Sequence, residues 1–159
     1  MSAEAPKLPE NLFFMKQMVQ NSCGTMALIH AILNNLQVIT LKDDSVIKNF
    51  YSKAQSLSAE ERGKLLASDK AFIETHQRLA EEGQTQTPPA DAVISNHFIA
   101  FVNVGDQIFE LDGRKNFPIS HGATTEDTFL SDAARVCKDF IARDPKEDKF
   151  TIMALAKAQ

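Results

Sequence analysis

The stretch from residue 23 to residue 33 most constrains how this chain can fold, because its side chains are apolar nearly all round a helix. The apolar positions are Met26, Leu28, Ile29, Ala31, Ile32 and Leu33. A helix without a polar face is normally buried inside a domain. Asn21 or Ser22 can cap its start, and the asparagines at 34–35 end it. We therefore expect a core helix around which the other elements pack.

Two short helices are expected next. One begins near Asp44 or Ser45, residue types that favour helix N-caps. The other begins at Ser58, which has Glu61 three residues later, the spacing of a capping box. Gly63 weakens this second helix.

A fourth helix is expected over residues 68–82, with three apolar side chains to bury: Phe72, Ile73 and Leu79. Residues 83–95 follow as a polar stretch with a double proline. Loops of that length without internal structure are usually functional or mobile.

The second half of the chain changes to β-rich runs at 96–104 and 107–112, separated by Gly105-Asp106. Two turn residues between such runs predict a β-hairpin. A last helix is expected over 126–142, capped by Thr124 or Thr125, and the segment 149–156 is expected to close the chain as a strand. Helices followed by an antiparallel sheet predict an α+β fold, with a helical lobe packed on the sheet. Residues 1–12 are expected to be a flexible lead-in.

Composition excludes several function classes. The 159 residues are 43% hydrophobic and 24% charged, which suits one globular domain. Seventeen basic and 21 acidic residues give a net charge of −4, which argues against nucleic acid as a partner. Without a membrane-length apolar run or a signal-like N-terminus, we expect a cytoplasmic protein. Scattered histidines, with no CxxC or HExxH spacing, predict no metal and no cofactor.

Cys23 is the first candidate for chemistry, because it lies in the first turn of the expected core helix. Free N–H groups and partial positive charge at a helix start favour a thiolate over a thiol. The alternative is that Cys23 is a small buried apolar residue. Cys137 lies in mid-helix on an apolar stripe, so we expect it to be structural. The two thiols are expected to be free.

A nucleophilic cysteine needs a base, and three of the four histidines are poor candidates. His30 follows Cys23 by seven residues, a rise of roughly 10 Å along the helix, and is expected to be a packed core histidine. His76 is expected to be exposed. His121 is expected in a loop without a partner.

His97 is the better candidate because of the hairpin geometry. With the turn at residues 105–106, counting back along both strands pairs Ile99 with Asp112 and His97 with Arg114. Side chains alternate between faces, so His97 and Asp112 share one face as diagonal neighbours, with Cα atoms roughly 7–8 Å apart. A hydrogen bond between them would orient the imidazole. The alternative is that Asp112 bonds Arg114 or a turn amide.

The strings FFMKQMVQNSCGTMALIHAI and NHFIAFVNVGDQIFELDGRKNFPISHGA closely resemble the ubiquitin carboxyl-terminal hydrolase family of cysteine proteases. The resemblance implies a papain-like fold and a thiol-dependent hydrolase that cleaves small adducts or peptides from the C-terminal glycine of ubiquitin. It implies that Cys23 is the nucleophile, His97 the general base and acid, and Asp112 the orienting carboxylate. Gln17 would be the oxyanion donor, and 83–95 the active-site crossover segment.

The family domain normally begins several dozen residues earlier, so the resemblance implies a catalytic domain over residues 13–159 that lacks the family's N-terminal segment. Ubiquitin, or a related modifier, is the implied partner. The alternative is a catalytically inactive homologue that binds ubiquitin or another protein. A third reading is an unrelated acyl transferase with Cys, His and Asp in the same chain order.

Overall fold

A computed structural model describes residues 8–81 and 96–156 of the chain. Its elements in chain order are α1 (Cys23–Leu33), α2 (Val46–Ala54), α3 (Ala59–Ser68), α4 (Lys70–Glu81), β1 (Ala100–Val104), β2 (Gln107–Leu111), β3 (Ile119–Ala123) and α5 (Phe129–Ile141).

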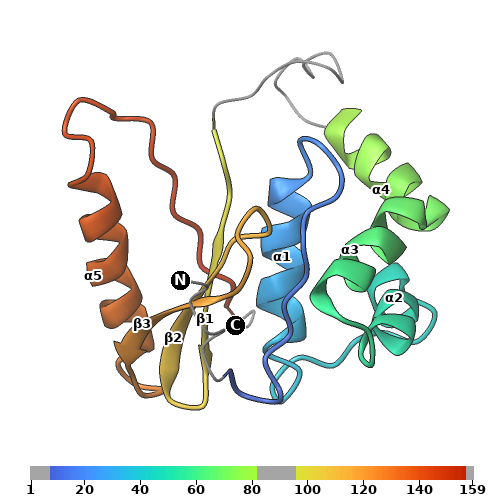
Figure 1. Ribbon diagram of the computed structural model, residues 1–159, viewed down its shortest axis with the longest axis horizontal. Helices are drawn as coiled ribbons and strands as arrows, with labels where there is room; N and C mark the ends of the chain where they lie inside the picture. The colour runs from blue at the N-terminus through green and yellow to red at the C-terminus, as the bar shows by residue number, and fades with distance from the viewer. Residues whose placement is uncertain (1–7, 82–95, 157–159) are drawn as a thin grey trace, which may run out of the picture.

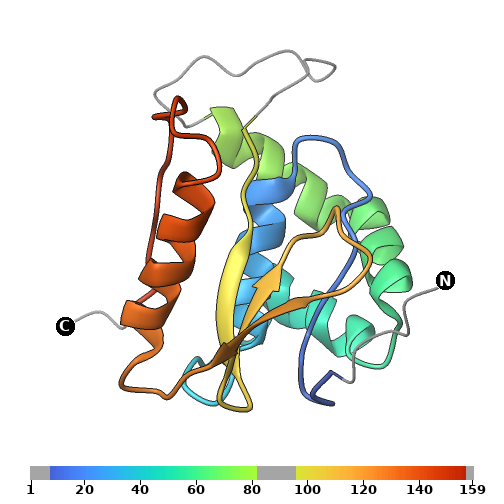
Figure 2. The same ribbon diagram turned by 60° about the vertical axis from the view of Figure 1, so that its left-hand side comes forward.

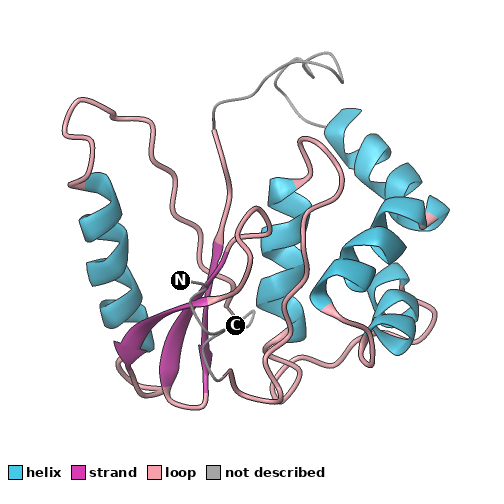
Figure 3. Cartoon of the chain, viewed as in Figure 1, coloured by secondary structure: helices cyan, strands magenta, loops and turns pink. Residues whose placement is uncertain are grey.

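The elements form an α+β arrangement, as the sequence predicts. A three-stranded antiparallel sheet in the order β1-β2-β3 lies between α5 on one side and α1 on the other (Figures 1 and 2). Helices α2, α3 and α4 lie beyond α1, on the side away from the sheet (Figures 1 and 3). In the described part of the chain, no helix has both the length and the apolar character needed to cross a bilayer.

The predicted hairpin register is confirmed as far as Ala100↔Leu111, whereas the expected pairs Ile99–Asp112 and His97–Arg114 lie beyond the ends of the two strands. Gly105 and Asp106 both have positive φ, of 60° and 57°, as a two-residue hairpin turn requires. Strand β1 pairs with β2 from Val104↔Gln107 to Ala100↔Leu111. Strand β3, which we did not predict, pairs with β2 on its other edge.

The extended segment 12–15 lies between the two apolar clusters of the domain. Phe13 and Met15 belong to the cluster that α1 forms with α2 and α3. Leu12 and Phe14 point the other way, into the cluster that covers the sheet. This alternation is that of a strand buried on both faces. Leu12 is therefore part of the core and not of a flexible lead-in.

Two polar side chains, one in α1 and one at its C-cap, supply the hydrogen bonds that a neighbouring strand would otherwise give this segment. Asn34 accepts a hydrogen bond from the Phe13 N–H and donates one to its carbonyl oxygen, both at 2.8 Å. His30, four residues earlier on the same helix face, accepts a hydrogen bond from the Met15 N–H through Nε2 at 3.1 Å. Buried backbone groups need such partners. The expectation that His30 is a core histidine is confirmed, since it is fully buried.

The helix starts follow the sequence in two cases. The Ser45 hydroxyl accepts a hydrogen bond from the Lys48 N–H and caps α2. Ser58 and Glu61 form the complete capping box of α3. Gly63 in α3 has a packing role that the sequence did not reveal, because a Cβ there would lie 2.1 Å from the carbonyl oxygen of Lys16.

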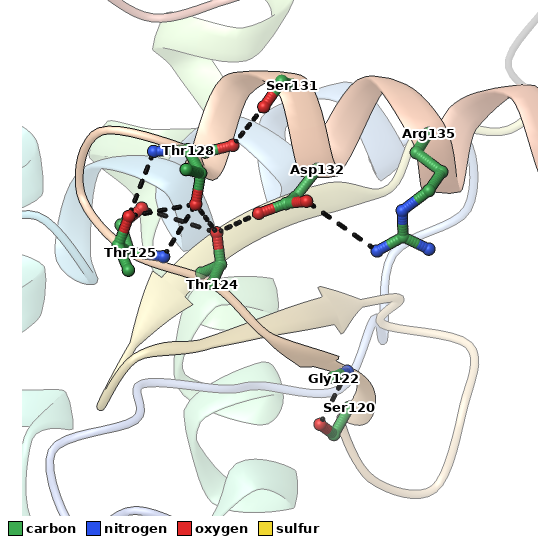
Figure 4. Close-up of polar contacts among 8 residues, drawn as sticks. All are labelled: Ser120, Gly122, Thr124, Thr125, Thr128, Ser131, Asp132 and Arg135. Carbon is green, nitrogen blue, oxygen red and sulfur yellow. Dashed lines mark hydrogen bonds and ion pairs between the residues drawn. The ribbon is translucent and has the colours of Figure 1, made fainter.

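Helix α5 begins later than predicted. Its N-cap position is Thr128, whose side chain makes no capping bond. Thr125 accepts a hydrogen bond from the Thr128 N–H at 3.2 Å, so it caps the turn before the helix (Figure 4). The Thr124 hydroxyl donates to Asp132 at 2.9 Å and ties this turn to the first turn of α5 (Figure 4).

Two further expectations are wrong. Residues 149–156 form no strand and are exposed, because none of the three strands pairs with them. Ile73 of α4 is 38% exposed, whereas Phe72 on the same helix packs edge-on against Phe50 in the core, with ring centroids 5.4 Å apart.

Replacing Asn34 tests how much its hydrogen bonds to the extended segment stabilise the fold. The variant Asn34→Ala leaves the buried N–H and carbonyl of Phe13 without partners, so the free energy of unfolding should fall by about 2–3 kcal/mol. Asn35→Ala is the matched control, because the Asn35 side chain donates to the Ala31 carbonyl of the preceding helix and not to the extended segment. Urea unfolding of both variants provides the measurement. An equal loss of unfolding free energy in the two variants would contradict the role of Asn34 in holding the extended segment.

Acid should destabilise the fold through His30. Burial lowers the pKa of His30 from 6.5 to about 4. Between these values the unfolded chain binds a proton that the folded chain excludes, so stability falls with falling pH, by about 3 kcal/mol in total. Above pH 6.5 the effect vanishes. Unfolding free energies across pH 4–7 should depend less steeply on pH in His30→Gln than in wild type, and equal slopes in the two proteins would contradict this role of His30.

Candidate active site

Cys23 is the first residue of α1, and its side chain is buried with 8% exposure. The predicted cap position, Ser22, precedes it, but the Ser22 hydroxyl donates instead to the Val19 carbonyl oxygen at 2.8 Å. No side chain therefore caps α1. The first N–H groups of a helix have no intrahelical acceptors, so the start of α1 presents unused donors around the sulfur.

His97 and Asp112 meet as the hairpin geometry predicts. His97 Nε2 lies 2.7 Å from Asp112 Oδ1, and the two side chains are 18% and 10% exposed. The same Oδ1 accepts a hydrogen bond from the Arg114 N–H at 2.9 Å. Asp112 therefore makes both of the expected interactions, one with His97 and one with a turn amide. The bond to the Arg114 amide fixes the carboxylate that orients the His97 ring.

Gln17 lies against the turn that carries Asp112. Its N–H donates to the Gly113 carbonyl oxygen at 2.9 Å. A Cβ on Gly113 would come within 2.9 Å of the Gln17 Cβ, so only glycine allows this approach. The Gln17 amide donates one N–H to the Val19 carbonyl at 2.9 Å, and its second N–H remains for a ligand.

Helix α1 packs on β1 and brings Cys23 toward the hairpin. The helix begins at the end of the molecule where the chain enters β1, opposite the hairpin turn (Figure 1). A Cβ on Gly24 would lie 3.7 Å from the Phe98 ring, so the residues after Cys23 and His97 are neighbours. The buried His97 Nδ1 has no hydrogen-bond partner. The structure therefore joins His97 to Asp112 directly but makes no hydrogen bond from Nδ1 to Cys23.

Two histidine expectations need correction. His121 lies in β3, where its Nε2 is 2.8 Å from Glu110 Oε2, and not in a loop without a partner. His76 is half-buried, with Nδ1 2.8 Å from the Thr25 hydroxyl. Sequence reasoning missed both because their partners, Glu110 and Thr25, come from other elements.

The two cysteines differ in setting. Both are free thiols. Cys137 lies half-buried in α5, and burial raises the pKa of its thiol. This environment suits a structural residue, as the sequence predicts.

Comparison with known proteins identifies the family. Residues 2–142 match the family described as ubiquitin carboxyl-terminal hydrolase, family 1. The chain belongs to this family. It is similar to the Drosophila melanogaster ubiquitin carboxyl-terminal hydrolase, with 53% identity over 95% of this chain, and to the human isozyme L1, with 44% identity over 92%. The chain spans 65% of the length of each of these relatives.

The α+β fold of this family 1 chain also resembles solved structures. The crystal structure of Trichinella spiralis UCH37 bound to ubiquitin vinyl methyl ester superposes with a TM-score of 0.66 and 25% identity, over 89% of this chain and 56% of that one. The family resemblance inferred from the Cys23 and His97 motifs is thereby confirmed. The crossover segment expected at 83–95 lies outside the described residues.

Replacing Gly113 with a larger residue should disrupt its close contact with Gln17. Overpacking by one methyl group typically costs about 1–3 kcal/mol, so Gly113→Ala should lower the free energy of unfolding by that amount. Gly24→Ala is the control, because its new methyl group meets only an ordinary contact at 3.7 Å. Thermal unfolding of both variants is the measurement. A Gly113→Ala protein as stable as wild type would contradict the close approach.

Proposed function

We propose that this protein is a thiol-dependent hydrolase that cleaves small adducts or peptides from the C-terminal glycine of ubiquitin through a Cys23 thioester. The observation that carries the proposal is the bond between His97 and Asp112, at 2.7 Å, beside the uncapped helix that starts at Cys23. Family membership supports the substrate class, since the relatives above are named ubiquitin carboxyl-terminal hydrolases.

In the proposed mechanism, Asp112 holds His97 Nε2 and leaves Nδ1 for the sulfur. A ring fixed by a carboxylate on one nitrogen presents the other in a defined direction and is stabilised when protonated. His97 takes the Cys23 proton, and the thiolate attacks the carbonyl carbon of the terminal glycine. A thioester forms as His97 gives the proton to the leaving amine.

Gln17 and the start of α1 supply the oxyanion site. The free N–H of the Gln17 side chain and the Cys23 backbone N–H donate to the oxygen on which charge develops. A single donor of this kind is typically worth about 2.7–4 kcal/mol of transition-state stabilisation. Water, deprotonated by His97, then attacks the thioester and releases ubiquitin with a free carboxylate.

We place this activity in the cytoplasm. Support comes from the two cysteines, which are both free, as is usual in a reducing compartment.

Capture by ubiquitin vinyl methyl ester tests the proposal. Wild type should form a covalent adduct, seen as a mass increase of one ubiquitin, and Cys23→Ser should form none. Cys137→Ser is the matched control and should react at the wild-type rate. Asp112→Asn should react more slowly.

Binding without covalent capture is the outcome that decides against catalysis. Folded, reduced protein that binds ubiquitin without forming an adduct would refute the hydrolase proposal and favour the binding alternative.

A further inference from the structure

Glu110 is a buried carboxylate outside the proposed triad. It lies on β2 with 2% exposure. Its Oε1 accepts a hydrogen bond from Lys115 Nζ, and its Oε2 lies 2.8 Å from His121 Nε2. Burying a carboxylate costs free energy unless it is paired. Both oxygens are here committed to nitrogen partners from different segments.

The Lys115 partner belongs to the turn that holds the site together. This turn, residues 112–115, is closed by the Lys115 N–H, which donates to the Asp112 carbonyl oxygen at 2.9 Å. The middle of the turn bonds Gln17 through the Gly113 carbonyl. The ion pair with Glu110 therefore clamps the far end of a turn whose first residue orients His97.

The His121 partner connects the same carboxylate to β3, the neighbouring strand, and to aromatic side chains of β1 and α5. The His121 ring packs edge-on against Phe101 of β1, with centroids 5.8 Å apart, and contacts Phe140 of α5 at 6.1 Å. Arg143 covers the other part of this cluster, with its guanidinium carbon 3.9 Å from the Phe140 ring centroid. The Glu110 carboxylate is thus bonded by Lys115 and His121. The His121 ring in turn packs against Phe140 of α5.

We propose that Glu110 is a positioning residue, which through Lys115 holds the 112–115 turn in the place where Asp112 reaches His97 and Gly113 reaches Gln17. The inference rests on the proposed function, since its readout is the reactivity of Cys23. Glu110 is the fourth residue of β2 and stands two residues before Asp112, which follows the end of the strand. A loosened turn displaces Asp112, weakens its bond to His97 and removes support from the protonated ring.

The test compares variants that remove opposite charges from the clamp. Glu110→Gln removes a negative charge and Lys115→Met removes a positive one, whereas Lys115→Arg keeps the cation and its donors. Asp112→Asn is the benchmark for loss of the orienting carboxylate. For each variant, the pH midpoint of Cys23 alkylation by iodoacetamide is measured by peptide mass spectrometry, together with kcat and KM on a fluorogenic ubiquitin C-terminal amide.

If Glu110 acts by positioning the turn, both Glu110→Gln and Lys115→Met should shift the alkylation midpoint in the same direction. Glu110→Gln and Lys115→Met should move the alkylation midpoint in the same direction as Asp112→Asn, by up to about one unit. Their kcat should fall about tenfold with KM near the wild-type value, and Lys115→Arg should match wild type. A direct charge effect would instead move the midpoint in opposite directions in the two variants, and this would overturn the proposal.

Other outcomes are also decisive. If Asp112→Asn moves the midpoint and neither clamp variant does, the positioning role fails while the proposed function stands. If wild type shows no turnover of the fluorogenic amide and no capture by ubiquitin vinyl methyl ester, the proposed function itself fails. Should Glu110→Gln not fold, Lys115→Met is compared at 0.1 M and 1 M NaCl. A charge effect shrinks as the screening length falls from about 10 Å to 3 Å, whereas a displaced turn gives the same shift at both salt concentrations.

Discussion

The hydrogen bonds from α1 and its C-cap to the extended segment 12–15 are the interaction on which the rest of this structure depends. This segment separates the two apolar clusters and contributes alternate side chains to each. Its backbone could not be buried there without partners, and Asn34 and His30 provide them from one helix face. Gln17 follows this segment by two residues, so the bonds that complete the core also position Gln17 at the site.

The site forms where three separate stretches of chain converge on one turn. Asp112 opens this turn and bonds His97 from the strand entry. Gly113 follows and bonds the backbone of Gln17. Helix α1, which begins at Cys23, packs on β1 beside them. The surrounding hydrogen bonds and packing orient the side chains of such a site. This is necessary because a side chain that rotates freely seldom has the geometry that the reaction requires.

Local signals predicted several features correctly, and their success has a common cause. A two-residue turn at Gly105-Asp106 determines the cross-strand pairs as far as Ala100↔Leu111, and counting beyond the ladder pointed to His97 and Asp112, whose side chains meet at 2.7 Å. The capping box at Ser58 and Glu61 likewise depends only on residues three apart. Such features depend on residues that are close together in the sequence. Their geometry follows from backbone dimensions and from the alternation of side chains along a strand, and not from distant packing.

The sequence by itself determined the α+β class, the hairpin register and the candidacy of Cys23, since these follow from periodicity, turn chemistry and motif. Only the tertiary structure decided that His121 belongs to a third strand bonded to Glu110, and that residues 149–156 form none. Edge strands need a partner that local propensity cannot supply. Long-range contacts likewise explain why Gly113 must be glycine, because the Gln17 backbone that excludes a side chain there lies far away in the sequence.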